Sequence, residues 1–363
     1  MKRAQQLTAL PIAAAFIGTV VGAGFATGQE VLQFFTFFGW KGFLGIGLVT
    51  ALFCYFGLAI MKISREQKAE SHLELVQYTL GYRLGTLMDW FITLSFLGVL
   101  IVMAAGSGAV AEEQLNLPPF NGSLAVILLT FFTVIWGVKT VIRAIALVVP
   151  FLLISLLAIA LFAIFSDPLS LQKLAILESL DSPVAANWSL AGLLYASYNV
   201  LLAVAILAPL GVAAKDKRYL FWGGILGGLG LGAGILAINL AIISAVPEIL
   251  PFQVPMIFLA KRLNPLCAYI FGFILLLEIY TTAVSVLYGF TARVASNNIQ
   301  RFCWAGLASV GALVAAQLGF SRVIAAVYPL MGVVGLFFLL SIIVAQLRDR
   351  FRKPLFKNYT SAG

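Results

Sequence analysis

The stretch Gly18-Thr19-Val20-Val21-Gly22-Ala23-Gly24 decides how this chain folds. It lies within an uncharged segment, residues 4–29, that is long enough to cross a bilayer as a helix. Glycine inside a helix costs about 1 kcal/mol relative to alanine. Backbone groups released by a break in hydrocarbon must be buried in protein or line a cavity. The stretch therefore predicts a broken helix beside a binding site or, alternatively, a helix that packs closely on its neighbours.

The composition of the 363-residue chain indicates an integral membrane protein. Hydrophobic residues make up 62% of the sequence and charged residues 10%, and the mean hydropathy is +1.04. Soluble proteins carry about 25% charged residues. The net charge of +9 does not indicate nucleic-acid binding, because the basic residues cluster between apolar segments, where they act as topology signals. The bilayer is thus the expected environment.

Ten segments are apolar enough to be membrane spans, most with the roughly 20 residues that a bilayer requires. We place them at residues 7–38, 40–61, 85–111, 121–138, 145–165, 188–213, 219–246, 265–294, 302–318 and 323–347. With the N-terminus inside, 18 of the 23 basic residues fall on the cytoplasmic side. The positive-inside rule therefore predicts a multi-pass protein of the plasma (inner) membrane with both termini cytoplasmic.

An even number of spans permits two five-helix halves of opposite topology. Inverted repeats of this kind are frequent in secondary transporters. We expect a first repeat at 1–165, an external connection at 166–187, a second repeat at 188–347 and a basic cytoplasmic tail at 348–363. The sixth span should then match the first with an interruption, at a polar island that contains Tyr195, Tyr198 and Asn199. The alternative is a continuous helix whose tyrosines form hydrogen bonds within the bundle.

The eighth span carries polar residues at helical spacing. Glu278, Thr281, Thr282 and Ser285 stand at i, i+3, i+4 and i+7, so they project from one face. A charge at this depth costs several kcal/mol, which makes an intramembrane acid a functional candidate by default. The alternative is that a protonated Glu278 bonds to a neighbouring backbone and that the hydroxyls bond back to their own helix.

These residues resemble a known architecture. Gly18, Val21, Gly22 and Gly24 are similar to the G-x-x-V-G-x-G motif of the unwound first helix in the LeuT-type fold of the amino acid, polyamine and organocation superfamily. The resemblance implies an all-α membrane protein of about ten helices arranged as a 5+5 inverted repeat. The ten-residue string from Val21 to Glu30 is also similar to the YkvI group of amino acid permeases.

The resemblance also implies a sodium site. Its ligands would be backbone carbonyls and hydroxyls from the first and eighth spans: Gly18, Val21, Glu278, Thr281 and Thr282. Phe25 stands where the first sodium site of that fold has an amide side chain, so a single coupling ion is expected. The fifth span, 145–165, has no lysine, which favours sodium over protons by the same comparison. Glu278 and Glu30 are nevertheless both placed to carry protons, so Na⁺ and H⁺ stay open as the coupling ion.

The function implied is an ion-coupled symporter for a small organic solute, an amino acid or related amine, with no cofactor besides the ion. The expected substrate site uses N–H groups of the second half of the first helix, which suit a carboxylate, together with side chains of spans 3 and 6. Ser107, between two glycines, would leave room for the ligand. The predicted site residues are Gly22, Ala23, Gly24, Phe25, Ser107, Tyr195, Tyr198 and Asn199.

Other functions fit the sequence less well. No HExxH, GxSxG or P-loop string is present, so an enzyme is not expected. The glycine-rich segment 223–234 is expected to serve helix packing, and His72, the sole histidine, is expected only to pack at the surface. A channel would show filter loops or charged rings. A ligand sensor that keeps the transporter fold without transport is the remaining alternative.

Overall fold

The computed structural model describes residues 7–69, 71–136 and 141–356, and over these residues the chain is helical, with one isolated bridge between Leu7 and Ala214. Nine described helices are long and apolar enough to cross a membrane. They are α4 (Trp40–Gln67), α6 (Tyr82–Leu115), α7 (Pro119–Trp136), α8 (Val141–Ser166), α10 (Trp188–Ala213), α11 (Lys217–Ser244), α13 (Pro265–Val294), α14 (Asn298–Ala316) and α15 (Phe320–Phe356). The shorter elements are α1 (Ala9–Val20), α2 (Ala23–Thr27), α3 (Gln29–Phe34), η1 (Thr36–Phe38), α5 (His72–Leu80), α9 (Leu171–Glu178) and α12 (Pro255–Leu263).

The first predicted span is divided into α1, α2 and α3, which confirms its interruption. Val21 and Gly22 have extended backbones between α1 and α2. The Gly22 N–H donates to the Val20 carbonyl at 3.0 Å, not to the carbonyl four residues back as in a continuous helix. A second break, which the sequence reading missed, falls at Gly28, whose φ of 81° favours glycine.

The sixth predicted span, α10, contains no interruption, so the expected break there is wrong. The polar groups of the island are satisfied without opening the helix. The Ser197 hydroxyl donates to the Leu194 and Gly332 carbonyls at 2.9 and 2.7 Å, and the Asn199 amide donates to the Tyr195 carbonyl at 3.0 Å. Neither glycine nor proline stands within the island, and nothing therefore disfavours the helix.

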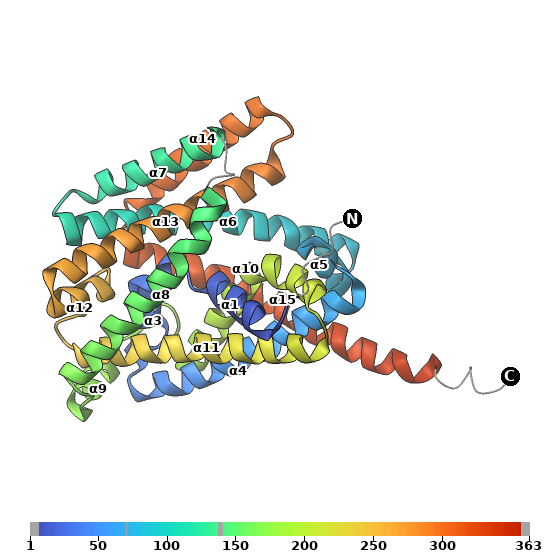
Figure 1. Cartoon of the computed structure of the whole chain (residues 1–363), viewed down its shortest axis with the longest axis horizontal. Helices are drawn as coiled ribbons and strands as arrows, with labels where there is room; N and C mark the ends of the chain where they lie inside the picture. The colour runs from blue at the N-terminus through green and yellow to red at the C-terminus, as the bar shows by residue number, and fades with distance from the viewer. Residues whose placement is uncertain (1–6, 70, 137–140, 357–363) are drawn as a thin grey trace.

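The helices form two groups. In the first, α10 packs against α1, α4 and α15, and α11 packs against α1 and α4. In the second, α6 packs against α7, α13 and α14, which lie together at the top of Figure 1. The short α2 contacts α6 and α13, so the broken segment lies where the two groups meet.

Glycines on α11 permit close approach within the first group. A Cβ at Gly227 would lie 2.5 Å from the Phe16 ring, and one at Gly228 would lie 2.5 Å from the Cys54 sulfur. The predicted packing role of this segment is therefore confirmed. The division of the chain into two inverted repeats stays a prediction.

Candidate functional site

The break between α1 and α2 leaves backbone groups without helical partners. The Val21 N–H donates to the Ile17 carbonyl at 2.8 Å, and the next turn begins with Ala26 donating to Gly22 at 3.0 Å. Within the described part of the chain, the carbonyls of Gly18 and Val21 receive no backbone N–H. These are the two carbonyls predicted to bind the ion, and the geometry leaves their oxygens available.

The break also has an open side. A Cβ built on Gly22 would meet nothing within 4 Å, and one on Gly18 would touch only Val149, at 3.6 Å. Both glycines are partly exposed, although most of the surrounding residues are buried. Space for a small ligand or ion therefore adjoins the broken backbone.

The α13 helix, which carries the polar face predicted for the eighth span, contacts α2. Glu278 is 3% exposed, and its Oε2 has no hydrogen-bond partner among the described residues. The hydroxyl of Thr281 donates to the Glu278 carbonyl at 3.1 Å, and that of Thr282 to Glu278 Oε1 at 3.5 Å. The hydroxyls thus bond within their own helix in this conformation. Ser285 is exposed and donates to the Thr281 carbonyl at 2.9 Å.

A buried carboxylate and three tyrosines, contributed by α3, α10 and α15, form a second cluster. The Tyr198 hydroxyl donates to Glu30 Oε2 at 2.5 Å. Tyr198 stacks on Tyr328 of α15, with ring centroids 4.6 Å apart and an interplanar angle of 6°. Tyr195 packs edge-on against Tyr198 at 5.4 Å, and its buried hydroxyl makes no hydrogen bond to any described residue. The cluster that contains the predicted proton carrier Glu30 thus includes two of the predicted substrate residues, Tyr195 and Tyr198.

Gly24 connects this cluster to α2. A Cβ on Gly24 would collide with the Glu30 carboxylate and would lie 3.0 Å from the Tyr328 hydroxyl. The turn at Gly28 brings the carboxylate back onto α2. Gly24 therefore makes room for a side chain of the protein itself, a role that the sequence did not indicate.

The predicted space beside Ser107 is absent in this conformation. A Cβ on Gly108 would lie 2.8 Å from the Pro119 carbonyl, and one on Gly106 would lie 3.0 Å from the Phe320 ring. The Ser107 hydroxyl donates to the Ala104 carbonyl at 2.8 Å, which also accepts from Ser123 at 2.7 Å. The flanking glycines thus serve packing against α7 and α15, and they do not form a ligand space. A direct role for Ser107 in substrate binding stays a prediction.

Sequence reasoning missed polar residues on α3 and α15 that join these two helices next to Glu30. Gln29 and Gln33 donate to the hydroxyl and the carbonyl of Ser321 at 2.8 and 2.9 Å. Met256 of α12 lies over Gly28, with its Cγ 3.1 Å from where a Cβ would stand. The sequence could have indicated Tyr328, because it is the one tyrosine in the apolar span 323–347 and directly precedes Pro329.

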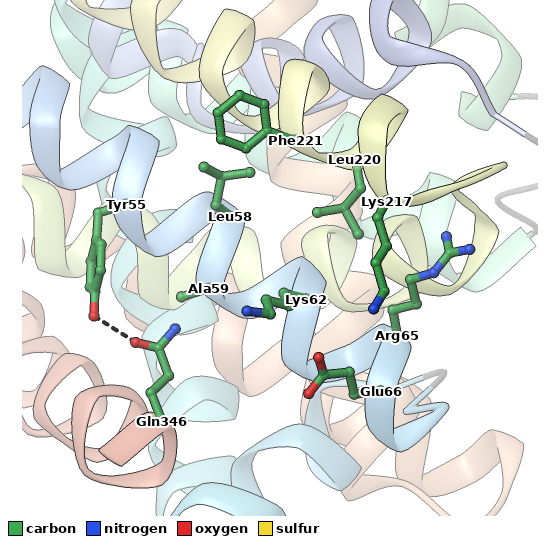
Figure 2. Close-up of a pocket in the computed structure, with 10 residues that line it drawn as sticks. All are labelled: Tyr55, Leu58, Ala59, Lys62, Arg65, Glu66, Lys217, Leu220, Phe221 and Gln346. Carbon is green, nitrogen blue, oxygen red and sulfur yellow. Dashed lines mark hydrogen bonds between the residues drawn. The ribbon is translucent and has the colours of Figure 1, made fainter. Parts of the chain in front are cut away.

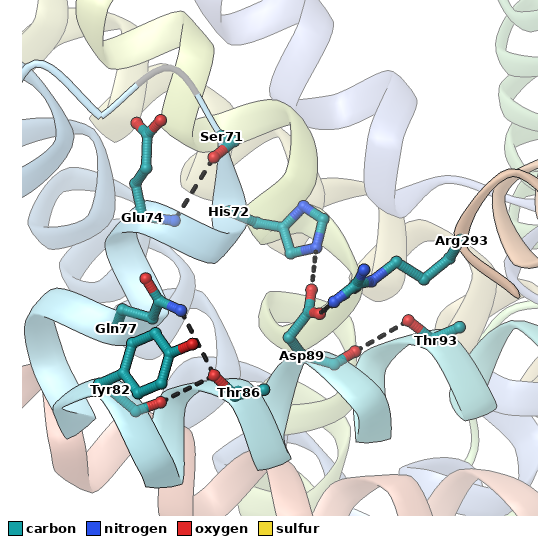
Figure 3. A network of polar contacts seen from close by, with 9 residues as sticks. All are labelled: Ser71, His72, Glu74, Gln77, Tyr82, Thr86, Asp89, Thr93 and Arg293. Carbon is teal, nitrogen blue, oxygen red and sulfur yellow. Dashed lines mark hydrogen bonds and ion pairs between the residues drawn. The ribbon is translucent and has the colours of Figure 1, made fainter. Parts of the chain in front are cut away.

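A polar network around Asp89 was also missed, and it corrects the expectation for His72 (Figure 3). Asp89 of α6 is 2% exposed. Arg293 of α13 donates to its Oδ2 through Nε at 3.0 Å and Nη2 at 2.5 Å, while His72 Nε2 of α5 lies 3.0 Å from its Oδ1. His72 therefore binds a buried carboxylate and does not merely pack. The signal was Asp89 itself, an acid within an apolar span.

The chain is similar to two curated proteins over nearly its whole length. The membrane protein YkvI of Bacillus subtilis (strain 168) is 31% identical over 335 residues, which cover 92% of this chain and 94% of that protein. The protein YyaD of the same organism is 26% identical, with 93% and 96% covered. No protein-family model matches the chain.

Several solved structures of transporters have similar folds. MhsT in complex with L-phenylalanine has a TM-score of 0.59 and 18% identity, with 94% of this chain and 92% of that chain covered. A Na⁺-coupled sialic acid symporter has a TM-score of 0.56 and 14% identity, with 94% and 80% covered. The manganese transporter of Eremococcus coleocola has a TM-score of 0.59 and 17% identity, with 92% and 77% covered. These similarities establish the LeuT-type fold.

Proposed function

This chain belongs to the family of the membrane protein YkvI, and we propose that it is an ion-coupled secondary transporter for a small organic solute. The observation that carries the proposal is the interrupted first span. Its free carbonyls at Gly18 and Val21 lie beside open space at Gly22, and α2 contacts the helix that bears the polar face. Discontinuous helices with free backbone ends at the meeting point of two helix groups are how this class of transporter binds ions and substrates.

The substrate we propose is an amino acid or a related amine. Its carboxylate would bind the N–H groups of Gly22 to Phe25; those of Ala23, Gly24 and Phe25 lack backbone acceptors at the start of α2, and that of Gly22 donates to the Val20 carbonyl. Tyr195, Tyr198 and Asn199 on α10 would supply polar contacts from the opposite side. A buried carboxylate next to Gly24 suits the amino group, because a buried charge requires a partner of opposite sign. The complex of MhsT with L-phenylalanine provides a precedent on this fold.

The coupling ion we propose is Na⁺, with H⁺ as the second candidate. Gly18, Val21, Glu278, Thr281 and Thr282 together offer five oxygens, the hard ligands that such a cation requires. The Na⁺-coupled sialic acid symporter gives a precedent for sodium on this fold. Proton coupling is favoured instead by Glu278 and Glu30, two carboxyl groups buried within the described bundle. The protein would lie in the plasma membrane with both termini cytoplasmic.

Transport can be tested in proteoliposomes whose internal volume is known. We expect a labelled amino acid mixture to accumulate above its external concentration when an inward sodium gradient is applied, or when a pH gradient replaces it. Gly22→Leu is the matched control, because its side chain would occupy the open space beside the break.

Two other functions would give different results in the same assay. Thermal stabilisation by an amino acid without accumulation would identify a ligand sensor. Gradient-independent flux that only equilibrates the label would identify a channel. Either result would refute the proposed symport.

A further inference from the structure

A groove of about 380 Å³ lies between α4, α11 and α15, and none of the described residues that line it belongs to the break between α1 and α2 (Figure 2). Its two ends differ in chemistry. Leu58, Leu220 and Phe221 line one end, and the cationic side chains of Lys62, Arg65 and Lys217 lie at the other. On one side, the Tyr55 hydroxyl donates to the Gln346 side chain at 2.5 Å and joins α4 to α15.

Helical spacing produces this segregation. On α4, Leu58, Lys62 and Arg65 follow one another at intervals of four and three, so they share a face and advance toward the end of the helix at Gln67. The α11 helix begins at Lys217 and reaches Leu220 and Phe221 within its first two turns. The cationic end of the groove is therefore formed by the end of α4 and the beginning of α11, and the apolar end by the parts of both helices farther from these termini. Lys62, Arg65 and Lys217 lie just outside the predicted spans 40–61 and 219–246, which is where we expect the membrane surface.

Among the described residues that line the groove, three cations stand against one acid, Glu66. Lys62 and Lys217 are exposed, and neither has a carboxylate within ion-pair distance among the described residues. Arg65 donates to two uncharged acceptors, the carbonyls of Ala214 and Lys215, at 2.5 and 3.4 Å. These bonds hold the guanidinium in place without cancelling its charge. The acid Glu66 makes an interaction of its own, and the cations of the groove outnumber it by three to one among the described lining residues.

We propose that this groove binds an anionic phospholipid. The phosphate would lie between Lys62, Lys217 and Arg65, and an acyl chain would follow the apolar end past Phe221, whose side chain is half exposed. Basic pockets between transmembrane helices at the membrane surface are the recognised form of an anionic headgroup site. The apolar end favours a lipid over a free phosphate ion, because a small anion would leave that surface uncovered.

The test is a lipid titration of the full-length purified protein followed by native mass spectrometry, with phosphatidylglycerol and phosphatidylcholine of identical chains. We expect phosphatidylglycerol to bind selectively. The double variant Lys62→Gln/Lys217→Gln should lose about thirtyfold in phosphatidylglycerol affinity, roughly fivefold for each cation near the membrane surface. The control Lys68→Gln/Arg83→Gln removes the same charge from exposed positions outside the groove and should stay within about twofold.

Three results would overturn the proposal. Equal losses in both double variants would mean that only overall surface charge attracts the lipid. Equal binding of the two lipids would mean that no headgroup is recognised. Displacement of bound lipid by millimolar inorganic phosphate would assign the basic end to a free anion. Because binding is measured without transport, the test stands apart from the proposed symport.

Discussion

Replacing Gly24 with alanine tests the relation between α2 and the buried Glu30 carboxylate. The new Cβ would occupy the space of that carboxylate and press on the Tyr328 hydroxyl. The obstructing atoms end a flexible side chain, so the carboxylate can swing aside. The cost is then the hydrogen bond from Tyr198, which is 2.5 Å long. A hydrogen bond to a charged group contributes about 1.5–3 kcal/mol, so we expect a loss of about 2 kcal/mol in the free energy of unfolding.

The assay is unfolding by SDS in mixed micelles, followed by circular dichroism. Gly22→Ala is the matched control, because its Cβ meets nothing within 4 Å and its backbone is extended; its stability should change by less than about 0.5 kcal/mol. In a Glu30→Ala background, Gly24→Ala should cost almost nothing, since the two residues are coupled. Equal losses in the two glycine variants, or full additivity of Gly24→Ala with Glu30→Ala, would refute the reasoning.

Three further predictions concern the open space, the ion and the Asp89 network. Gly22→Leu should abolish accumulation of substrate while leaving insertion and stability intact, because its side chain would fill the open side of the break; uptake assays paired with micelle unfolding measure both. Thr282→Ala should raise the sodium concentration needed for half-maximal uptake more than the substrate concentration, whereas Glu278→Gln should remove any response to a pH gradient. Arg293→Gln should destabilise the protein by about 2 kcal/mol, since it leaves the Asp89 carboxylate buried with only His72 beside it, and adding Asp89→Asn should restore most of that loss in micelle unfolding.

Each of these predictions has a result that would count against it. Normal transport by Gly22→Leu would remove the proposed site from the break. Uptake that proceeds equally well without sodium would make the oxygen ligands a remnant of the fold, and full pH-driven accumulation by Glu278→Gln would end the proton role of that residue. An Arg293→Gln variant as stable as the parent would mean that the half-exposed arginine contributes little to the network.

Helix bounds could be predicted where residues next to the helix determine them. The bounds of α10 and α13 match the predicted spans 188–213 and 265–294. Both helices begin where predicted because Asn187 and Asn264, which directly precede the apolar segments, cap their N-termini. The first break was predictable from its glycines, because glycine weakens a helix; the glycines of α11 leave that helix continuous, since they pack against α1 and α4. The break expected in α10 is absent, because the side chains of Ser197 and Asn199 donate to carbonyls of the same helix without unwinding it.

The candidate site was less predictable because its contacts join distant parts of the chain. Glu30 and Tyr198 are 168 residues apart, and only the packing of α3 between α10 and α15 brings them together. A glycine offers the same signal whether it makes room for a ligand, as proposed for Gly22, or for a protein side chain, as at Gly24. Sequence alone therefore finds the residues of the site more readily than their partners.

The two breaks around α2 give this short helix a mechanical independence. Residues beyond Gly28 are tied to α10 and α15 through Glu30 and Gln29, whereas α2 itself contacts α6 and α13 of the other helix group. Non-helical junctions at Val21–Gly22 and at Gly28 separate these attachments. A shift of one helix group relative to the other would therefore change backbone angles at these two junctions and would not require a continuous helix to bend.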